Sequence, residues 1–177
     1  MFACAQAGIS PDILCLSKGI TGGFLPLGAT LAGEAVYRAF HREDRSKALF
    51  HGHSYTGNPL ACAAALANLA VFKDEPVSER IAAIAALHRR ELKRFAGRRE
   101  VAAARQRGTI AAIELRVPDA GYLSELGPRL YRFYLSRGVL LRPLGNVVYL
   151  IPPYCSSEKE LRKAYDAIEE SLALAAS

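Results

Sequence analysis

Lys18 is the residue whose position in this sequence most favours chemistry. It follows the apolar run 13–16, which has the pattern of a strand buried on both faces of a parallel sheet. Small and rigid residues surround it in the loop that follows: Gly19, Gly22, Gly23 and Pro26. Ligands of open α/β sheets bind beyond the carboxyl ends of the strands, where this strand would deliver the Lys18 amine. A lysine in a dry site loses part of its preference for the charged form, and its free amine can form a Schiff base with a carbonyl. A surface lysine at a strand end is the alternative interpretation, against which the glycine-rich loop weighs.

A second group of polar side chains lies in the segment 50–59, FHGHSYTGNP. Asn58 followed by Pro59 predicts the start of a helix, with a capping residue and then proline at the first helical position. The hydroxyls of Ser54 and Thr56, just ahead of that helix, suit a phosphate group. Ordinary turn hydrogen bonding explains the same two hydroxyls equally well.

Arg142 ends the apolar run of VLLRP and precedes a proline turn and the unusual segment YLIPPY. Its planar guanidinium can hold a carboxylate through two parallel hydrogen bonds. An arginine on the surface at the end of a hairpin is the alternative. The constrained backbone around Pro143 favours a positioned, carboxylate-binding Arg142.

Metal and redox chemistry have weaker support. His51 and His53 share one face if the segment is extended, but no third ligand stands at a suitable spacing, so hydrogen-bonding histidines are expected and no metal site. The cysteines lack metal or disulfide spacing and are expected to be buried, reduced thiols of a cytoplasmic protein: Cys4, Cys15, Cys62 and Cys155. No run approaches the roughly 20 apolar residues that a membrane span needs.

The hydrophobic pattern divides the chain into two parts. Residues 1–73 hold strands near 13–16 and 27–32, a helix at 34–40 and an alanine-rich helix at 60–72, whose small side chains would allow close packing on another element or subunit. The first of these elements resemble the later part of a larger α/β domain whose other strands lie elsewhere. Residues 74–177 read as an α+β lobe, with helices at 77–96, 122–136 and from a capping box at 157–160 to about 174, and strands at 101–107, 109–115, 139–142 and 147–151. His88 lies on the apolar face of the first of these helices and is expected to be a packed, hydrogen-bonded residue.

The net charge of +6 at pH 7 suggests an anionic partner only weakly. Much of it lies in residues 80–107, where interspersed glutamates indicate a solvated helix face. Few aromatic side chains are available there to stack on bases, so nucleic-acid binding is a minor alternative.

Three blocks of sequence together resemble the class III aminotransferases that use pyridoxal 5'-phosphate: LSKGITGGFLPLGATL, HGHSYTGNPLACAAALANL and LLRPLGNVVYLIPPY. The last two blocks are most similar to the branch of that class that acts in biotin synthesis. The resemblance covers essentially the whole chain but only about the second half of a family member. It implies an α/β fold, the C-terminal half of a fold type I transferase, with a partial large domain at 1–73 and a small α+β domain at 74–177.

The resemblance also implies roles for individual residues. Lys18 would be the lysine that binds pyridoxal phosphate covalently, and His53 and Ser54 would contact the cofactor phosphate from the neighbouring subunit of a homodimer. Gly52 would line the substrate pocket, and Arg142 would hold the carboxylate of the amino-oxononanoate substrate. S-adenosylmethionine as amino donor is implied in the same way.

Two further interpretations stay open. The chain could act on another ω-amino substrate within the same class. Alternatively, it could be a non-catalytic fragment that retains only the interfaces of the family, because the acidic residue expected to pair with the pyridine nitrogen has no counterpart in this sequence.

Overall fold

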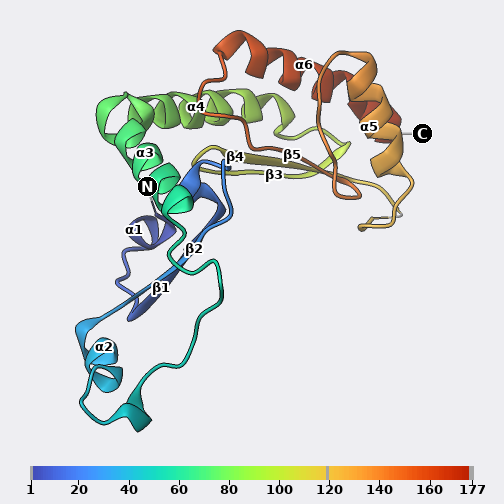
Figure 1. Ribbon diagram of the computed structural model, residues 1–177. Coiled ribbons are helices and arrows are strands. Elements are labelled where there is room, and N and C mark those ends of the chain that lie inside the picture. Colours follow the sequence, from blue (N-terminus) through green and yellow to red (C-terminus); the bar gives the residue numbers. More distant parts are fainter. Residues whose placement is uncertain (1, 119, 176–177) are drawn as a thin grey trace. The chain divides into compact units, whose positions relative to one another are not determined.

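The structure, a computed structural model, describes residues 2–118 and 120–175 (Figure 1). The chain divides into two compact units, Met1–Pro76 (unit 1) and Val77–Ser177 (unit 2). The sequence pattern placed a boundary after residue 73, where a charged segment interrupts the alanine-rich helix. The assignment of the two units to a cofactor domain and a small C-terminal domain stays a prediction.

Unit 1 consists of short elements and one long helix (Figure 1). In chain order they are α1 (Ala3–Ala7), β1 (Ile13–Ser17), the 3-10 helix η1 (Lys18–Thr21), β2 (Gly28–Ala32), α2 (Glu34–Phe40), the 3-10 helix η2 (Arg45–Lys47) and α3 (Pro59–Asp74). The start of α3 is confirmed as predicted, because the Asn58 side chain accepts a hydrogen bond from the Leu60 amide at 3.0 Å. Pro59 occupies the first turn, where its missing N–H is not needed.

The two strands of unit 1 pair antiparallel, with Ile13 opposite Ala32 and Ser17 opposite Gly28. The expectation that β1 belongs to a parallel sheet is wrong for this pairing. Parallel strands need a crossover connection of about a dozen or more residues, whereas η1 and a turn return the chain directly alongside β1. Ile13 is 52% and Leu31 50% exposed, so burial of both faces is not achieved within the described chain.

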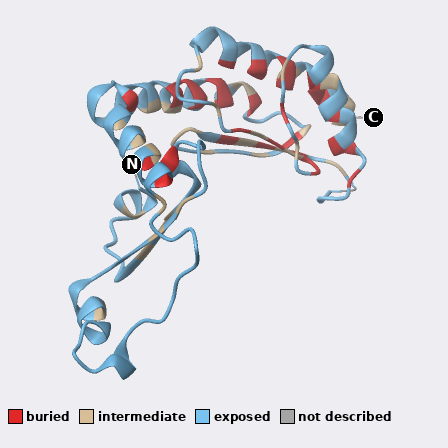
Figure 2. Cartoon of the chain, viewed as in Figure 1, coloured by how far each residue is buried: buried red, intermediate tan, exposed pale blue. Residues whose placement is uncertain are grey.

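Unit 1 has almost no core of its own (Figure 2). Within residues 2–76, only Thr21, Ala61 and Ala65 are buried. Large apolar side chains are exposed instead, among them Phe24, Phe50, Leu60 and Leu66. Exposed apolar side chains of this kind are what an interface with further polypeptide would cover.

Unit 2 is an antiparallel sheet with helices packed on it (Figure 1). Its elements are α4 (Val77–Glu91), the 3-10 helix η3 (Leu92–Phe95), β3 (Val101–Arg107), β4 (Ile110–Leu115), α5 (Leu126–Ser136), β5 (Val147–Leu150) and α6 (Glu158–Ala175). The strand order is β3-β4-β5, and α6 packs against both α4 and α5. The predicted α+β pattern of this region is confirmed, with the exceptions given below.

One continuous hydrophobic core holds unit 2 together (Figure 2). On β4, alternate residues are fully buried, which is the pattern of a strand with one face on a core: Ala111, Ile113 and Leu115. The helix α6 adds a stripe at helical spacing to the same core: Leu161, Tyr165, Ile168 and Leu172. The capping box at the start of α6 is confirmed, because the Ser157 amide donates to Glu160 Oε2 at 2.7 Å and the Glu160 amide donates to Ser157 Oγ at 3.3 Å.

Two details of unit 2 differ from the sequence prediction. Residues 139–142 do not form a strand, because Pro143 cannot donate to a ladder and β5 already pairs with β4 through residues 147–150. An isolated bridge between Leu144 and Val147 closes the turn instead. The helix expected at 122–136 begins only at Leu126, although it ends as predicted, with Gly138 in the left-handed conformation at φ 64°.

The cysteines are free thiols, but the expectation of burial is wrong for three of them. Cys15, Cys62 and Cys155 are exposed, and Cys4 is half-buried. Cys15 lies on the uncovered β1 and Cys62 on the outer side of α3, both on the coreless unit 1, which explains their exposure. Within residues 2–118 and 120–175, no group of three or more His, Cys, Asp or Glu side chains could hold a metal ion. The helices in the same ranges are all too short or too polar to cross a membrane.

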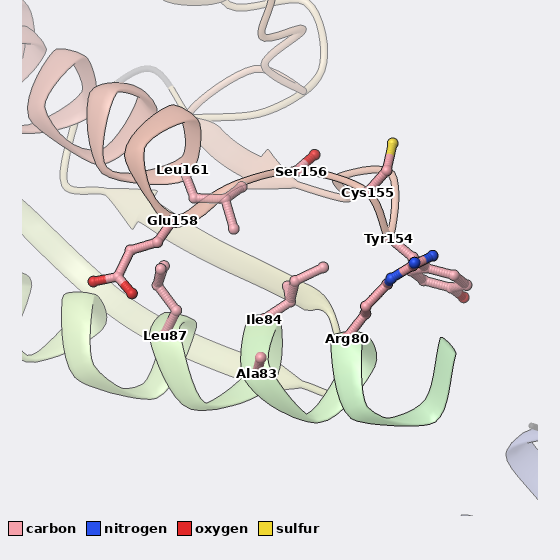
Figure 3. A pocket seen from close by; sticks show the side chains of 9 residues that line it. All are labelled: Arg80, Ala83, Ile84, Leu87, Tyr154, Cys155, Ser156, Glu158 and Leu161. Carbon is pink, nitrogen blue, oxygen red and sulfur yellow. The ribbon is translucent and has the colours of Figure 1, made fainter. Parts of the chain in front are cut away.

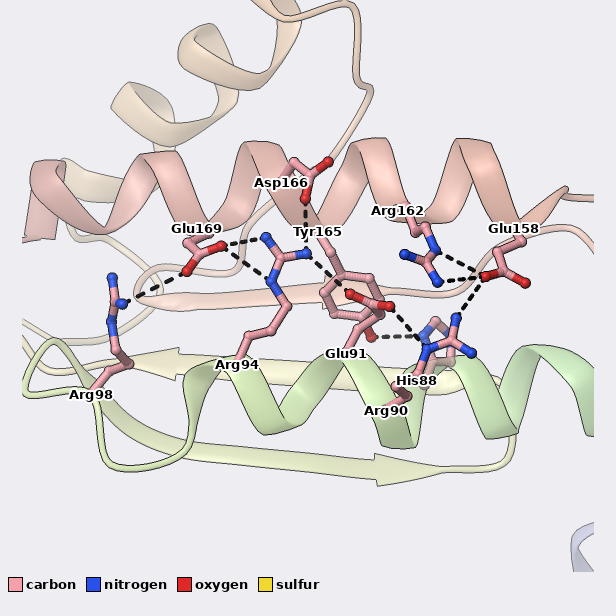
Figure 4. Close-up of polar contacts among 10 residues, drawn as sticks. All are labelled: His88, Arg90, Glu91, Arg94, Arg98, Glu158, Arg162, Tyr165, Asp166 and Glu169. Atoms are coloured by element: carbon pink, nitrogen blue, oxygen red, sulfur yellow. Dashed lines mark hydrogen bonds and ion pairs between the residues drawn. The ribbon is translucent and has the colours of Figure 1, made fainter.

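His88 is packed and hydrogen-bonded, as predicted. It is fully buried, and its ring lies between the carbonyl of Thr109 and the hydroxyl of Tyr165. Figure 4 shows the contact with Tyr165. Because a carbonyl only accepts, Nε2 carries the proton and donates to Thr109 O at 3.1 Å. The neutral ring then accepts from the Tyr165 hydroxyl at Nδ1, over 2.7 Å. Burial lowers the pKa of His88, against the raising effect of the Thr109 backbone hydrogen bond.

This burial predicts a pH-dependent stability. In the unfolded chain His88 titrates near 6.5, above its folded pKa, so below about pH 6.5 the unfolded state binds more protons. The free energy of unfolding is therefore expected to be constant above that pH and to fall on acidification, with a slope of at most about 1.4 kcal/mol per pH unit. Urea titrations between pH 7.5 and 5.5 measure it. A His88→Gln variant serves as the control and should lose the part of the pH dependence that His88 contributes.

A network of charged side chains joins α4 and the following 3-10 helix η3 to α6 (Figure 4). Arg94 is its centre, with ion pairs to Glu91 at 3.1 Å and Asp166 at 2.8 Å and a closer one to Glu169. The Glu91 side chain is only 6% exposed, so its charge needs this partner. Arg90 and Arg98 also pair with carboxylates. These pairs neutralise much of the positive face on which the nucleic-acid alternative depended.

Replacing Arg94 by alanine is expected to lower the free energy of unfolding by about 1–3 kcal/mol, because it leaves the buried Glu91 carboxylate short of donors. Arg98→Ala is the matched control: its pairs are longer, at 3.7 and 3.9 Å, and its side chain is 43% exposed, so the loss should stay below about 0.5 kcal/mol. Chemical denaturation of the two variants compares them. Equal losses would show that the network contributes only as ordinary surface charge.

Candidate active site

The structure places Lys18 at the junction of β1 and η1, directly after the strand ends at Ser17. Its backbone φ is +53°, and Lys18 is the one non-glycine residue with positive φ in the described part of the chain. The left-handed conformation costs an L-residue roughly 1–2 kcal/mol. Strain of this kind concentrates at functional sites, where surrounding contacts enforce it. The predicted lysine therefore stands at a backbone position that the fold enforces against local preference.

The Lys18 side chain is exposed, and the described residues make no hydrogen bond or ion pair to it. Unit 1 thus supplies the position of the amine but not the dry surroundings expected from the sequence. A Cβ built on Gly19 or Gly23 would meet nothing within 4 Å, so the space beside the lysine is open in this unit.

Thr21 anchors the other end of the lysine turn. It is 1% exposed, and its hydroxyl approaches the Leu25 carbonyl at 2.6 Å and the Lys18 carbonyl at 3.3 Å. Gly22 then reverses the chain at φ +62°, and its amide donates to the Gly19 carbonyl at 3.2 Å. Sequence reasoning did not single out Thr21, because a threonine in a glycine-rich loop carries no distinguishing pattern.

The segment 51–58 is a compact turn that leads into α3. The His53 amide donates to Thr56 Oγ1 at 2.9 Å, and the Thr56 amide returns a bond to the His53 carbonyl at 2.9 Å. His53 Nδ1 accepts from the Tyr55 amide at 3.1 Å, which directs Nε2 away from the turn. Thr56 is therefore used in the turn itself, whereas the Ser54 hydroxyl has no partner among residues 2–118 and 120–175.

Gly52 is exposed, and a Cβ added to it would lie 3.6 Å from Thr56 Oγ1, an ordinary contact. Local packing within unit 1 therefore does not require glycine at this position. Its role in lining a substrate pocket stays a prediction.

Arg142 lies in unit 2, between the buried Leu141 and the turn that begins at Pro143. Its side chain is exposed and has no partner in the described ranges. The turn behind it is firmly held: Asn146 is 7% exposed, its amide group donates to the Leu115 carbonyl at 2.8 Å, and the Leu115 amide donates back to the Asn146 carbonyl at 2.9 Å. Lys18 and Arg142 belong to different units, so their meeting at one site stays a prediction.

The donor set fits the cofactor that the sequence suggested. An amine that is free to condense with an aldehyde stands on η1, and a free hydroxyl and an imidazole nitrogen that suit a phosphate stand just ahead of α3. The Lys18 amine, the Ser54 hydroxyl and His53 Nε2 make no hydrogen bond or ion pair with the described residues. Arg94, in contrast, is paired with Glu91 and Asp166.

A separate hollow of about 350 Å³ lies in unit 2, between α4 and the segment that leads into α6 (Figure 3). Ile84 and Leu87 of α4 face Leu161 of α6 across it, and Arg80, Tyr154 and Cys155 stand at one end. None of the predicted site residues lines it. It is therefore not the candidate active site.

The chain matches the class-III aminotransferase family model over residues 1–172. It is 47% identical to the adenosylmethionine-8-amino-7-oxononanoate aminotransferase of Synechococcus elongatus, over 97% of this chain and 40% of that protein. The solved structure of the enzyme of the same name from Methanocaldococcus jannaschii matches with a TM-score of 0.88 at 41% identity, over 98% of this chain and 42% of that one. An amine transaminase from an uncultivated Pseudomonas species, solved with pyridoxal phosphate bound, matches with a TM-score of 0.88 at 33% identity, over 99% of this chain and 41% of that one.

The chain thus spans about two fifths of the length of these relatives. The predicted fold, part of a pyridoxal-phosphate-dependent transaminase, is confirmed by these superpositions. From the match over residues 1–172, the chain belongs to the class III aminotransferase family.

Proposed function

We propose that this chain forms part of an aminotransferase that converts 8-amino-7-oxononanoate to 7,8-diaminononanoate in biotin synthesis, with S-adenosylmethionine as amino donor. The observation that carries the proposal is the unpartnered Lys18 amine, held at a left-handed backbone position where β1 ends. The chain is 47% identical to a relative named adenosylmethionine-8-amino-7-oxononanoate aminotransferase, and this similarity supports the choice of substrates.

Pyridoxal 5'-phosphate, when bound, supplies the aldehyde that condenses with an amine and the ring that accepts electrons from the substrate. Lys18 would hold the cofactor through its Nζ. Once free, the same amine would take a proton from the substrate as general base and return one as general acid. Ser54 donates its hydroxyl to the phosphate, and His53 offers the nitrogen that its turn leaves free.

Arg142 binds the carboxylate of amino-oxononanoate through its guanidinium fork, and Gly52 leaves space for the substrate. The donor exchanges its amine for a ketone and the acceptor exchanges its ketone for an amine, so no external oxidant or reductant is required. The exposed apolar surface of unit 1 supports assembly with further polypeptide, which we place in a cytoplasmic homodimer whose cofactor site is shared between subunits.

The test measures diaminononanoate by mass spectrometry after incubation with pyridoxal phosphate, amino-oxononanoate and S-adenosylmethionine. It uses the purified chain and, where the coding frame continues upstream, the longer polypeptide. Product that depends on all three additions supports the proposal. Product only with lysine or another amine as donor assigns a different ω-aminotransferase. No product and no cofactor binding in a folded sample of either length identifies a non-catalytic fragment and overturns the proposal.

A further inference from the structure

Asn68, on α3, contacts the turn that carries Lys18. Its side-chain Nδ2 lies 2.9 Å from the Gly19 carbonyl and 3.2 Å from the Ile20 carbonyl, the two carbonyls that directly follow the lysine. A primary amide has two N–H donors, so one asparagine can satisfy both acceptors. These bonds span 49 and 48 residues of sequence, so they tie the turn to a distant helix and not merely to itself.

The helix is shaped for this approach. Ala61, Ala65 and Asn68 follow one another at helical spacing, and the two alanines are among the few buried residues of unit 1. Their small side chains bring α3 against η1, which identifies the close-packed neighbour expected for the alanine-rich helix. On the other side of the contact, a Cβ on Gly22 would lie 3.0 Å from Asn68 Oδ1, so glycine leaves the space that the amide occupies.

We propose that Asn68 is a positioning residue, which keeps the Lys18 amine in its reactive place by holding the carbonyls of Gly19 and Ile20. The left-handed backbone of Lys18 would relax if the turn were free, and the amine at the end of a long side chain would move with it. This inference rests on the proposed function of Lys18.

The test reacts the purified chain with pyridoxal 5'-phosphate, reduces it with borohydride, and measures by peptide mass spectrometry how fast each lysine is labelled. The labelling rate of Lys18 relative to that of Lys73, on the same helix, reports positioning. Asn68→Ala removes both N–H donors. Asn68→Asp keeps the shape of the side chain but places carboxylate oxygens, which only accept, against the carbonyl oxygens of Gly19 and Ile20. Both variants are expected to lower the relative rate of Lys18 by about tenfold or more, whereas wild type labels Lys18 preferentially.

Two controls separate positioning from folding and from charge. Ala67→Asp adds the same negative charge at the adjacent exposed position and should leave the Lys18 rate unchanged. Asn68→Gln, which retains the donors, should recover part of the preference that Asn68→Ala loses. A purely structural role would lower the melting temperature without this pattern of rescue.

Hydrogen exchange of the peptide covering residues 17–25 tests, without the cofactor, whether Asn68 holds the lysine turn in place. Asn68→Ala should speed its exchange severalfold, and unchanged exchange together with unchanged Lys18 labelling would overturn the inference. If wild type labels Lys18 no faster than Lys73 while hydrogen exchange still responds to Asn68→Ala, the proposed function of Lys18 is wrong. The conclusion that Asn68 holds the turn is then still supported.

Discussion

Lys18→Ala is expected to abolish the borohydride-trapped cofactor adduct at residue 18 and to lower transamination by about 10³-fold or more in the assembled enzyme. No other described residue stands at the end of β1 with an unpartnered amine. Lys18→Arg should be equally inactive, because a guanidinium keeps its proton and does not condense with an aldehyde under these conditions.

The measurement pairs absorbance of the bound cofactor with mass spectrometry of the reduced peptide. Lys73→Ala, which removes a lysine from the far end of α3, is the control and should leave both readouts at the wild-type level. Retention of a specific adduct or of activity in Lys18→Ala would disprove the assignment of the catalytic residue.

Gly145→Ala is expected to destabilise unit 2 by about 2–4 kcal/mol. A Cβ at this position would overlap the carbonyl group of Gly121 and lie 3.1 Å from the Tyr122 amide nitrogen, so backbone would have to move on both sides. The φ of +58° adds the conformational cost that alanine bears in the left-handed region. Because Gly145 lies in the turn directly after Arg142, the substitution should also weaken carboxylate binding in the assembled enzyme.

Gly97→Ala isolates the conformational part of this effect. Its φ is +75°, but a Cβ there would meet nothing within 4 Å, so the loss should be only about 1–2 kcal/mol. Urea denaturation measures the loss in free energy of unfolding for both variants. The difference between the two losses is the contribution of the overlap with Gly121. Equal losses in the two variants would show that the turn accommodates the extra methyl group.

Local signals in the sequence predicted most elements and the candidate residues. The cap at Asn58, the capping box at Ser157 and the left-handed stop at Gly138 each depend on contacts within a few residues, and the structure has all three. Lys18 was recognised for a similar reason, because the end of a strand and the start of a glycine-rich loop are adjacent in sequence.

Pairing and burial were harder to predict, because they depend on partners far along the chain or outside it. An apolar strand such as 13–16 has the same pattern in a parallel or an antiparallel pair, and only the short return through η1 decides between them. Residues 139–142 are as apolar as a strand but find no ladder. Asn68 was missed because its acceptors lie about 50 residues earlier. Its position on the same face as Ala61 and Ala65 was the signal that could have found it.

The left-handed backbone of Lys18 lowers the stability of the fold at the same position where the proposed chemistry needs an amine. Glycine or asparagine would adopt the same φ more readily, so a descendant of this chain that no longer needed the amine would gain stability by drifting to either. A lysine at such a costly position is what selection for its chemistry would favour. A lineage that had become a mere scaffold would have little reason to keep it.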